Sequence, residues 1–495
     1  MQRSYADSNP TVNDFAGVKT ARSYQVTTIY NNTQTVIEQA NPFEAAVLEL
    51  ESNLAGWVLL PGDEDYEEAR LTQNRAYSRF PAVIVKAVNA EDVAMAVRFA
   101  RSHALTISVR SGGHSFAAFS SSDGGMVIDL RLLNKVSIDP KTGIARAQPA
   151  VKSSDLGAMA LEHGLALSTG DTPSVALGGL SLGGGIGWMV RKQGLTIDNL
   201  RSVEMVTAYG QIVRASTEEN PDLFWALRGG GGNFGIVTEF EYQLHRVGTV
   251  YAGLVALPLT REALRAAAEY GRHAPNELTL IINVMAAPPA PFVPEDVVGT
   301  PVVMAMLCFA GNPEEGEKAV QPLRDIAIPL FEFVAPMPYP AIYALTEELA
   351  KPMSFLVRSL FTRELSDNIV NTFVDAMMLA GPKCLLQVRP LGGKFAEVAS
   401  DATAFAHRDA GYMLAAIAEW ETGTPGDAEV AWAQAVYEMV AAESSGVYVN
   451  FLQNEPERIG EAYPEATYRR LAEVKRRFDP ENVFSRNENV KAAVS

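Results

Sequence analysis

The segment from Ile107 to Ser115 places the strongest constraint on how this chain can fold. It reads ISVRSGGHS, so a short apolar strand ends abruptly in a polar turn with two adjacent glycines. Glycine leaves backbone N–H groups unshielded, and an anion can therefore approach such a turn closely. His114 lies at this turn, either as a solvated histidine or as a residue that holds a ligand. The turn by itself favours the solvated histidine.

A predicted βαβ unit sets the position of this turn. The apolar residues at 83–88 predict a strand, Asn89 can cap a helix after it, and the strand that begins at Ile107 follows. A right-handed crossover places the Gly-Gly-His turn at the carboxyl edge of the strands, where ligands of such sheets bind. A ligand at His114 is therefore a real alternative.

The composition excludes several classes of protein. A chain of 495 residues with a formal net charge of −17 has no excess of Lys and Arg to drive nucleic-acid binding. Cys308 and Cys384 are the only cysteines and form no CxxC motif, so we expect neither a disulfide framework nor a metal site. Two free thiols suit a reducing compartment.

The terminal segment and the hydropathy pattern predict a soluble, cytoplasmic protein. Residues 1–42 are polar and without periodicity, and we interpret them as an N-terminal extension without a signal peptide. No uncharged apolar stretch reaches the roughly 18 residues that cross a bilayer. We therefore expect neither a membrane nor a nucleic acid as a partner.

A second glycine-rich segment runs from Ser168 to Gly194. It contains six glycines between Gly178 and Gly187, and each costs about 1 kcal/mol relative to Ala in a helix, so a regular helix is disfavoured. Interleaved leucines and Trp188 favour a packed loop over a flexible surface loop. Such a loop suits a flat cofactor lying along the backbone.

The run GGGNFG at Gly230–Gly235 matches the spacing GxGxxG. It precedes a predicted strand at Ile236–Leu244, whereas a dinucleotide fingerprint follows a strand and opens a helix. The run therefore does not predict a nicotinamide site.

The middle of the chain predicts an antiparallel sheet with helices on one face. Apolar runs at Leu278–Val284, Val302–Cys308 and Cys384–Arg389 read as strands between helical segments. By alternation Gln387 and Arg389 share one strand face, which lines either a substrate pocket or a solvent-exposed edge.

Near the end of the chain, alternation in GVYVNFL predicts a strand that places Tyr448 and Asn450 on one face. Two such polar residues need partners if they are buried, either in a structural pair or in a catalytic site. A final helix is expected at about Glu465–Phe478, ending before Asp479-Pro480.

Together these blocks resemble one family. The blocks are RSGGHS at 110–115, GGLSLGGGIGW at 178–188, WALRGGGGNFGIV at 225–237, YVNF at 448–451 and FDPENVFSRN at 478–487. The chain is similar to the vanillyl-alcohol oxidase/p-cresol methylhydroxylase (PCMH-type) flavoproteins and, among them, to the berberine-bridge-enzyme-like branch of FAD-linked oxidases.

The resemblance implies an α+β, bilobal fold. It consists of a PCMH-type FAD-binding lobe at 43–247, a substrate-binding lobe at 248–440 with an antiparallel sheet backed by helices, and a C-terminal segment at 441–495 that returns to the first lobe. The turn at 110–115 would wrap the FAD pyrophosphate, and His114 would be bonded to the flavin 8α-methyl group. Many members have a second bond from a cysteine whose place here is held by Thr172, so a link through His114 only is expected.

The resemblance also implies site residues. Tyr448 is the candidate for orienting or deprotonating the substrate, and Asn450 for hydrogen bonding near the flavin ring or the substrate. Gln387 and Arg389, which strand alternation places together, are the candidates for binding a substrate hydroxyl or carboxylate. The expected cofactor-binding residues are Arg110, Ser111, Gly112, Gly113, His114, Ser115, Thr169, Gly170, Asp171, Thr172, Leu177, Gly178, Gly179, Gly183, Gly184, Gly185, Gly187, Gly235, Ile236, Val237, Asn450 and Asn487. Leu177 holds a place associated in the family with oxygen access.

The implied function is that of an FAD-dependent oxidoreductase. The favoured form is an oxidase that moves a hydride from a CH–OH or CH–NH carbon of a small molecule to flavin N5 and reduces O2 to H2O2. The substrate would be a sugar, a secondary-metabolite alcohol or an amine. The alternatives are a dehydrogenase with another acceptor and a flavin-bearing binding protein with little turnover. The oligomeric state is not predicted.

Overall fold

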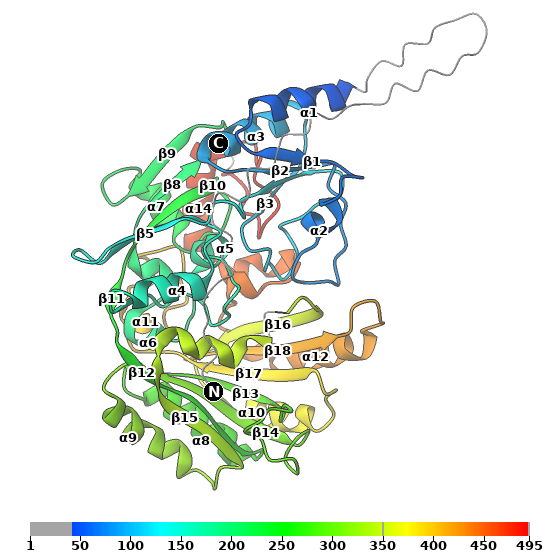
Figure 1. Cartoon of the computed structure of the whole chain (residues 1–495). Coiled ribbons are helices and arrows are strands. Elements are labelled where there is room, and N and C mark those ends of the chain that lie inside the picture. The colour runs from blue at the N-terminus through cyan, green and yellow to red at the C-terminus, as the bar shows by residue number, and fades with distance from the viewer. Residues whose placement is uncertain (1–41, 349–350, 494–495) are drawn as a thin grey trace, which may run out of the picture. The chain divides into compact units, whose positions relative to one another are not determined.

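The computed structural model describes residues 42–348 and 351–493 (Figure 1). The chain divides into a unit that ends at Glu49 and a second unit from Leu50 to Ser495. The described part of the first unit belongs to helix α1 (Pro42–Asn53). The N-terminal extension expected at 1–42 thus lies almost wholly outside the described residues.

The N-terminal half of the second unit, called here the first lobe, contains a four-stranded sheet with the order β1-β2-β4-β3. β2 and β3 each run parallel to β4, as a βαβ unit requires. The Asn89 side chain accepts a hydrogen bond from the Asp92 N–H at the start of the connecting helix, which confirms the predicted cap. The elements are β1 (Trp57–Leu59), α2 (Tyr66–Arg70), β2 (Val83–Lys86), α3 (Ala90–Ser102), β3 (Ile107–Arg110) and β4 (Met126–Asp129).

A five-stranded antiparallel sheet, with the order β5-β6-β10-β8-β9, completes the first lobe. The strand expected after the GGGNFG run is β10. The strands are β5 (Val136–Asp139), β6 (Ile144–Ala147), β8 (Leu200–Val206), β9 (Ile212–Ser216) and β10 (Ile236–Gln243), beside a small pair formed by β7 (Leu165–Ala166) and β11 (His245–Arg246). The helices are α4 (Ser153–Leu161), α5 (Leu177–Gly183), α6 (Val190–Gln193), η1 (Thr196–Asn199) and α7 (Pro221–Leu227).

The glycine-rich segment contains α5 and α6, so the prediction that it forms no helix was wrong. Leu177 and Leu182 project from α5 into the core of the first lobe, and their burial stabilises a helix that glycine disfavours. The segment is well packed, as expected, since Leu177 and Trp188 are fully buried.

The second lobe is built on a seven-stranded antiparallel sheet with the order β15-β12-β14-β13-β17-β18-β16. The three strands predicted in this region correspond to β13, β14 and β17. The strands are β12 (Thr249–Pro258), β13 (Leu278–Ala286), β14 (Pro301–Phe309), β15 (Phe331–Pro338), β16 (Ser354–Thr362), β17 (Cys384–Pro390) and β18 (Tyr412–Trp420).

Four helices cover one face of this sheet (Figure 1). Leu386 and Val388 of β17 point into the core beneath these helices, whereas the alternate residues of β17 point to the opposite face. The predicted α+β architecture with helices backing an antiparallel sheet is confirmed. The helices are α8 (Arg261–His273), α9 (Pro313–Arg324), α10 (Asp367–Met377) and α12 (Asp427–Val440), with η2 (Tyr339–Thr346), α11 (Lys394–Glu397) and η4 (Ala441–Glu443) elsewhere in the lobe.

The C-terminal segment packs against the first lobe through α14, which contacts α7. The expected strand around Tyr448 was wrong: residues 449–451 form a 3-10 turn in which the Phe451 N–H donates to the Tyr448 carbonyl at 2.8 Å. Alternation cannot show whether a neighbouring strand exists, and here the pairing is limited to one isolated bridge between Gly446 and Phe361 of β16. The elements are η5 (Val449–Phe451), η6 (Pro456–Arg458), α13 (Ile459–Ala462) and α14 (Glu465–Phe478).

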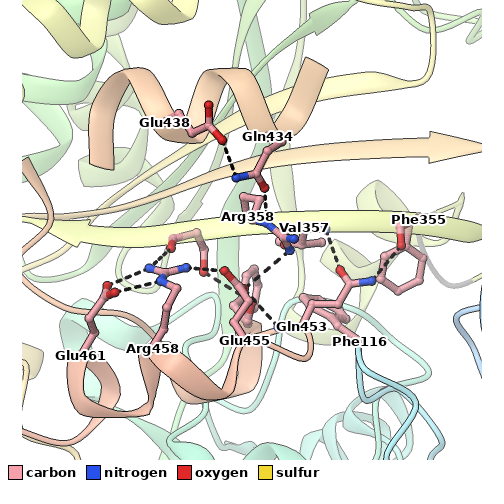
Figure 2. Close-up of polar contacts among 12 residues, drawn as sticks. Phe116, Phe355, Val357, Arg358, Gln434, Glu438, Gln453, Glu455, Arg458 and Glu461 are labelled. Carbon is pink, nitrogen blue, oxygen red and sulfur yellow. Dashed lines mark hydrogen bonds and ion pairs between the residues drawn. The ribbon is translucent and has the colours of Figure 1, made fainter. Parts of the chain in front are cut away.

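A buried polar network joins the C-terminal segment to β16 (Figure 2). The Gln453 amide accepts from the Val357 N–H at 2.7 Å and donates to the Phe355 carbonyl at 3.0 Å. Arg458 donates to Glu455 at 3.0 Å and to the Ser359 carbonyl at 2.9 Å. Both members of the Arg458–Glu455 pair are buried, and each has one further ion-pair partner, Glu461 for Arg458 at 2.9 Å and Arg358 for Glu455 at 3.6 Å.

Replacement of Arg458 tests this anchor. Arg458→Met leaves the buried Glu455 with only its 3.6 Å contact to Arg358, and we expect the free energy of unfolding to fall by about 3 kcal/mol. The exposed pair of Arg469 and Glu465 provides the control, because Arg469→Met should change it by less than about 1 kcal/mol. Thermal and urea unfolding give the comparison, and equal effects of the two substitutions would contradict the anchor.

Candidate active site

A cavity of about 380 Å³ lies between the two lobes and the C-terminal segment. Its walls are the turn after β3, the glycine-rich segments at 170–180 and 231–237, the faces of β16, β17 and β18, and the tail at 484–488. The predicted residues that line it are Ser111, Gly112, Gly113, His114, Ser115, Gly170, Asp171, Thr172, Gly178, Gly179, Gly235, Ile236, Val237, Gln387, Arg389, Tyr448, Asn450 and Asn487.

The remaining predicted residues do not line the cavity. The Arg110 guanidinium is buried and donates to the Ala69 carbonyl, which supports the turn from behind. The Leu177 side chain is fully buried in the core of the first lobe, so it neither widens nor narrows the cavity. The others in this group are Thr169, Gly183, Gly184, Gly185 and Gly187.

These glycines serve close packing between segments. A Cβ on Gly183 would lie 2.1 Å from Asn450 Oδ1, and one on Gly187 would lie 2.1 Å from the Thr169 carbonyl oxygen. Gly185 has a φ of +85° and its Cβ would lie 2.0 Å from Thr196 Oγ1. The absence of side chains therefore lets the Tyr448–Asn450 turn approach the end of α5.

The turn after β3 presents unpaired backbone donors to the cavity. Gly113 has a φ of +79°, and the N–H groups of Gly112, Gly113 and His114 have no acceptor among residues 42–348 and 351–493. Backbone donors that converge without partners form a site for an anion such as a phosphate. Arg486, which also lines the cavity, adds a cation on the side of the tail.

His114 is held in a defined orientation at this turn. Its Nε2 lies 3.1 Å from the Ser174 hydroxyl. Burial, with the positive charges of Arg110 and Lys152, lowers the pKa of His114 to about 4. The imidazole is therefore neutral at pH 7 and keeps a lone pair on one ring nitrogen.

The Tyr448 hydroxyl oxygen accepts two hydrogen bonds. The Gly185 N–H donates to it at 2.8 Å, and Asn450 Nδ2 donates at 2.9 Å. The hydroxyl proton has no acceptor in the described part of the chain. Burial raises the pKa of Tyr448 to about 12, while the two donors oppose this rise by stabilising the phenolate.

Gln387 and Arg389 belong to a polar chain across the cavity. Arg389 Nη2 binds the Asp171 carboxylate at 2.5 Å and Arg389 Nε donates to Gln387 Oε1. Gln387 Nε2 in turn donates to Asn283 Oδ1 at 2.9 Å. The guanidinium is thus neutralised by an acid from the first lobe.

The sequence did not single out several residues that line the cavity. Among them are the aromatic rings of Phe116, Phe355 and Phe451 and the acids Glu419 and Glu488. Glu488 directly follows the predicted Asn487, so the tail motif held a signal for it. Its Oε1 is buried without a partner, and burial, with the charges of Glu455 and Glu457, raises its pKa to about 7.

The described residues show no group of His, Cys, Asp or Glu that could hold a metal ion. No helix among them is long and apolar enough to cross a membrane. Cys308 and Cys384 are both buried and unpaired.

Comparison with known proteins gives the family. Residues 81–216 match an FAD binding domain, and residues 447–491 match the berberine and berberine-like family. The chain is 32% identical over 455 residues to (R)-6-hydroxynicotine oxidase of Paenarthrobacter nicotinovorans, covering 88% of this chain and 97% of that protein. A 166-residue region, 33% of each chain, is 42% identical to xylooligosaccharide oxidase of Thermothelomyces thermophilus.

Solved structures of similar enzymes agree. The crystal structure of 6-hydroxy-D-nicotine oxidase from Arthrobacter nicotinovorans has a TM-score of 0.80 at 29% identity, covering 88% of this chain and 98% of that one. Xylooligosaccharide oxidase from Myceliophthora thermophila, solved with xylobiose, has a TM-score of 0.80 at 25% identity, covering 91% and 100%.

The fold and the matched domains define an FAD-linked oxidoreductase. The chain belongs to the berberine-bridge-enzyme-like branch of the FAD-linked oxidase superfamily.

Proposed function

We propose that this enzyme is an oxidase that dehydrogenates a CH–OH or CH–NH carbon of a small molecule and returns the electrons to O2 with release of H2O2. When bound, FAD supplies the acceptor for the hydride. One observation supports the proposal above all: Gly112–His114, whose N–H groups are unpaired, and Tyr448, whose hydroxyl accepts two hydrogen bonds, line the same cavity.

The residues of the cavity suit FAD. The turn at Ser111–Ser115 would hold the pyrophosphate, with Arg486 as a further cation. The neutral His114 imidazole would form the covalent bond to the flavin. Thr172 also lines the cavity but has no thiol, so we propose that the link through His114 is the single one. Asn450 and Asn487 would hydrogen-bond the cofactor.

Tyr448 is proposed as the group that accepts the substrate proton. A phenolate formed at this site keeps two N–H donors, from Gly185 and Asn450, and the charge of Arg389 also lowers the pKa of Tyr448. These groups stabilise the phenolate before the reaction, and the phenolate becomes a neutral hydroxyl when it takes the substrate proton.

Gln387 and Arg389 are proposed to orient the substrate. Since Arg389 is already neutralised by Asp171, a hydroxyl or carbonyl oxygen suits this position better than a carboxylate, which would compete with Asp171. Substrate candidates therefore include both amines and saccharides, the classes on which the two named relatives act.

A redox screen tests the proposed activity. Anaerobic addition of a substrate from a panel of cyclic amines, oligosaccharides and aromatic alcohols should bleach the yellow absorbance of the purified protein. Air should then restore the colour with formation of one H2O2 per turnover. Recovery with a dye but not with air would show a dehydrogenase, and the absence of any bleaching across the panel would contradict an enzyme of this class.

The covalent link has a separate test. After acid precipitation the yellow colour should remain in the pellet of the unmodified protein and move to the supernatant in His114→Ala. His163→Ala is the control because that histidine is exposed and remote from the cavity. Thr172→Cys should add a second link and raise the flavin potential. Colour released from unmodified protein would exclude the His114 bond.

The role of Tyr448 predicts a pH effect. The hydroxyl is protonated at pH 7, so kcat/KM should rise with pH toward the raised pKa as the phenolate forms. Tyr448→Phe should lower kcat by roughly 10²- to 10⁴-fold and remove this rise while the flavin is retained. Tyr270→Phe is the control, because its hydroxyl donates to the Ala319 carbonyl and neither residue lines the cavity. An unchanged pH profile in Tyr448→Phe would show that another group accepts the substrate proton.

A further inference from the structure

The Glu419 carboxylate is an unpaired acid on the wall of the cavity. Glu419 lies near the end of β18 and is half-buried. Its carboxylate makes no hydrogen bond or ion pair within residues 42–348 and 351–493. Burial raises its pKa, and the positive charge of Lys383 opposes this rise. A cationic partner would stabilise the ionised form of a carboxyl group placed in this way.

The other charges on this side of the cavity are compensated. Arg389 is paired with Asp171, and Lys351 is paired with Glu348 at 2.7 Å. On the part of the cavity wall formed by β16, β17 and β18, Glu419 is therefore the charged side chain that has no ion-pair partner among the described residues. The net charge of −17 adds a long-range field of the same sign, which attracts cations toward the cavity.

An aromatic wall lies next to this carboxylate. Phe355 of β16 is the direct cross-strand neighbour of Glu419. Phe116 meets the Phe355 ring edge-on at 5.3 Å and the Phe451 ring at 5.0 Å. An ammonium group is bound well by a carboxylate together with aromatic faces.

Phe355 is held rigidly in this position. Its carbonyl accepts from both Asn74 and Gln453 at 3.0 Å, and its N–H donates to Asn74 Oδ1 (Figure 2 shows the Gln453 contact). A wall that is fixed before binding loses little conformational freedom when a ligand arrives.

Strand register gives the distance between this wall and the polar chain at Gln387. Gln387 pairs with Ala415, which is four residues before Glu419 on β18. Four residues along a strand span about 14 Å. A molecule that reaches from the Gln387 row to Glu419 is therefore elongated.

We infer that Glu419 and Phe355 form an outer subsite for the ammonium group of an elongated substrate, an inference that rests on the function proposed above. Because Glu419 lies about 14 Å along the sheet from the Gln387 row, its contact with the ammonium group does not change at the reacting carbon and stabilises the ground state and the transition state equally. It thus lowers KM and leaves kcat unchanged.

The probes are ω-amino alcohols and α,ω-diols of matching chain length, titrated calorimetrically into the flavin-loaded full chain at pH 8. Amino alcohols of the fitting length should bind more tightly than the diols. Glu419→Gln should weaken them by roughly tenfold and leave the diols unchanged. Glu421→Gln removes an equal charge at an exposed position outside the cavity and should change neither.

Three results would overturn the subsite: no preference for amino alcohols, no binding of any amino alcohol, or an equal loss in Glu421→Gln, which would indicate the general field alone. Flavin content and bleaching by the substrate panel are measured on the same samples. If the flavin is bleached but amino alcohols are not preferred, the proposed function is supported and the subsite is rejected. If amino alcohols are preferred but no substrate bleaches the flavin, the subsite is supported and the oxidase function is rejected.

Discussion

The hydrogen bond from the Gly185 N–H to the Tyr448 hydroxyl is the contact on which the site depends, because it joins the end of α5 to the turn of the C-terminal segment. The contact forms only because residues 183–185 carry no side chains there: a Cβ on Gly183 would overlap the Asn450 amide. The glycine run thus has two functions along its length. Gly178 and Gly179 face the cavity, and the later glycines admit the residues that polarise the tyrosine.

Two segments distant in sequence, one around Asn74 and the C-terminal segment, meet at β16. Gln453 and Asn74 both donate to the Phe355 carbonyl, and Arg458 donates to the Ser359 carbonyl from the buried pair with Glu455. An isolated strand edge would present these carbonyls to water. Here their pairing fixes β16 against both the first lobe and the C-terminal segment, so the shape of the cavity is set before any ligand binds.

Local sequence patterns correctly predicted the elements whose buried face repeats along the sequence: the βαβ unit before the Gly-Gly-His turn, the strand β10 and the helix-backed sheet. They failed for segments whose secondary structure is determined by contacts with residues distant in sequence. Burial of Leu177 and Leu182 produces a helix that its glycines oppose, and Tyr448 lies in a turn although its neighbours alternate like a strand. The acid Glu419 was not predicted because its place on the wall follows from the register of β18 against β16 and β17, which no local pattern contains.

The pairing of Arg389 explains the electrostatic gradient of the cavity. A counter-charge stabilises a buried guanidinium, and Asp171 supplies it from the loop that also carries Thr172. The inner end is therefore close to neutral, which suits a neutral hydroxyl or amine at the reacting carbon. At the outer end Glu419 has no such partner. The ammonium group of an entering substrate is consequently bound favourably at Glu419. The uncharged end of that substrate is then directed toward Gln387 and Tyr448. The same gradient that attracts the substrate thus orients it.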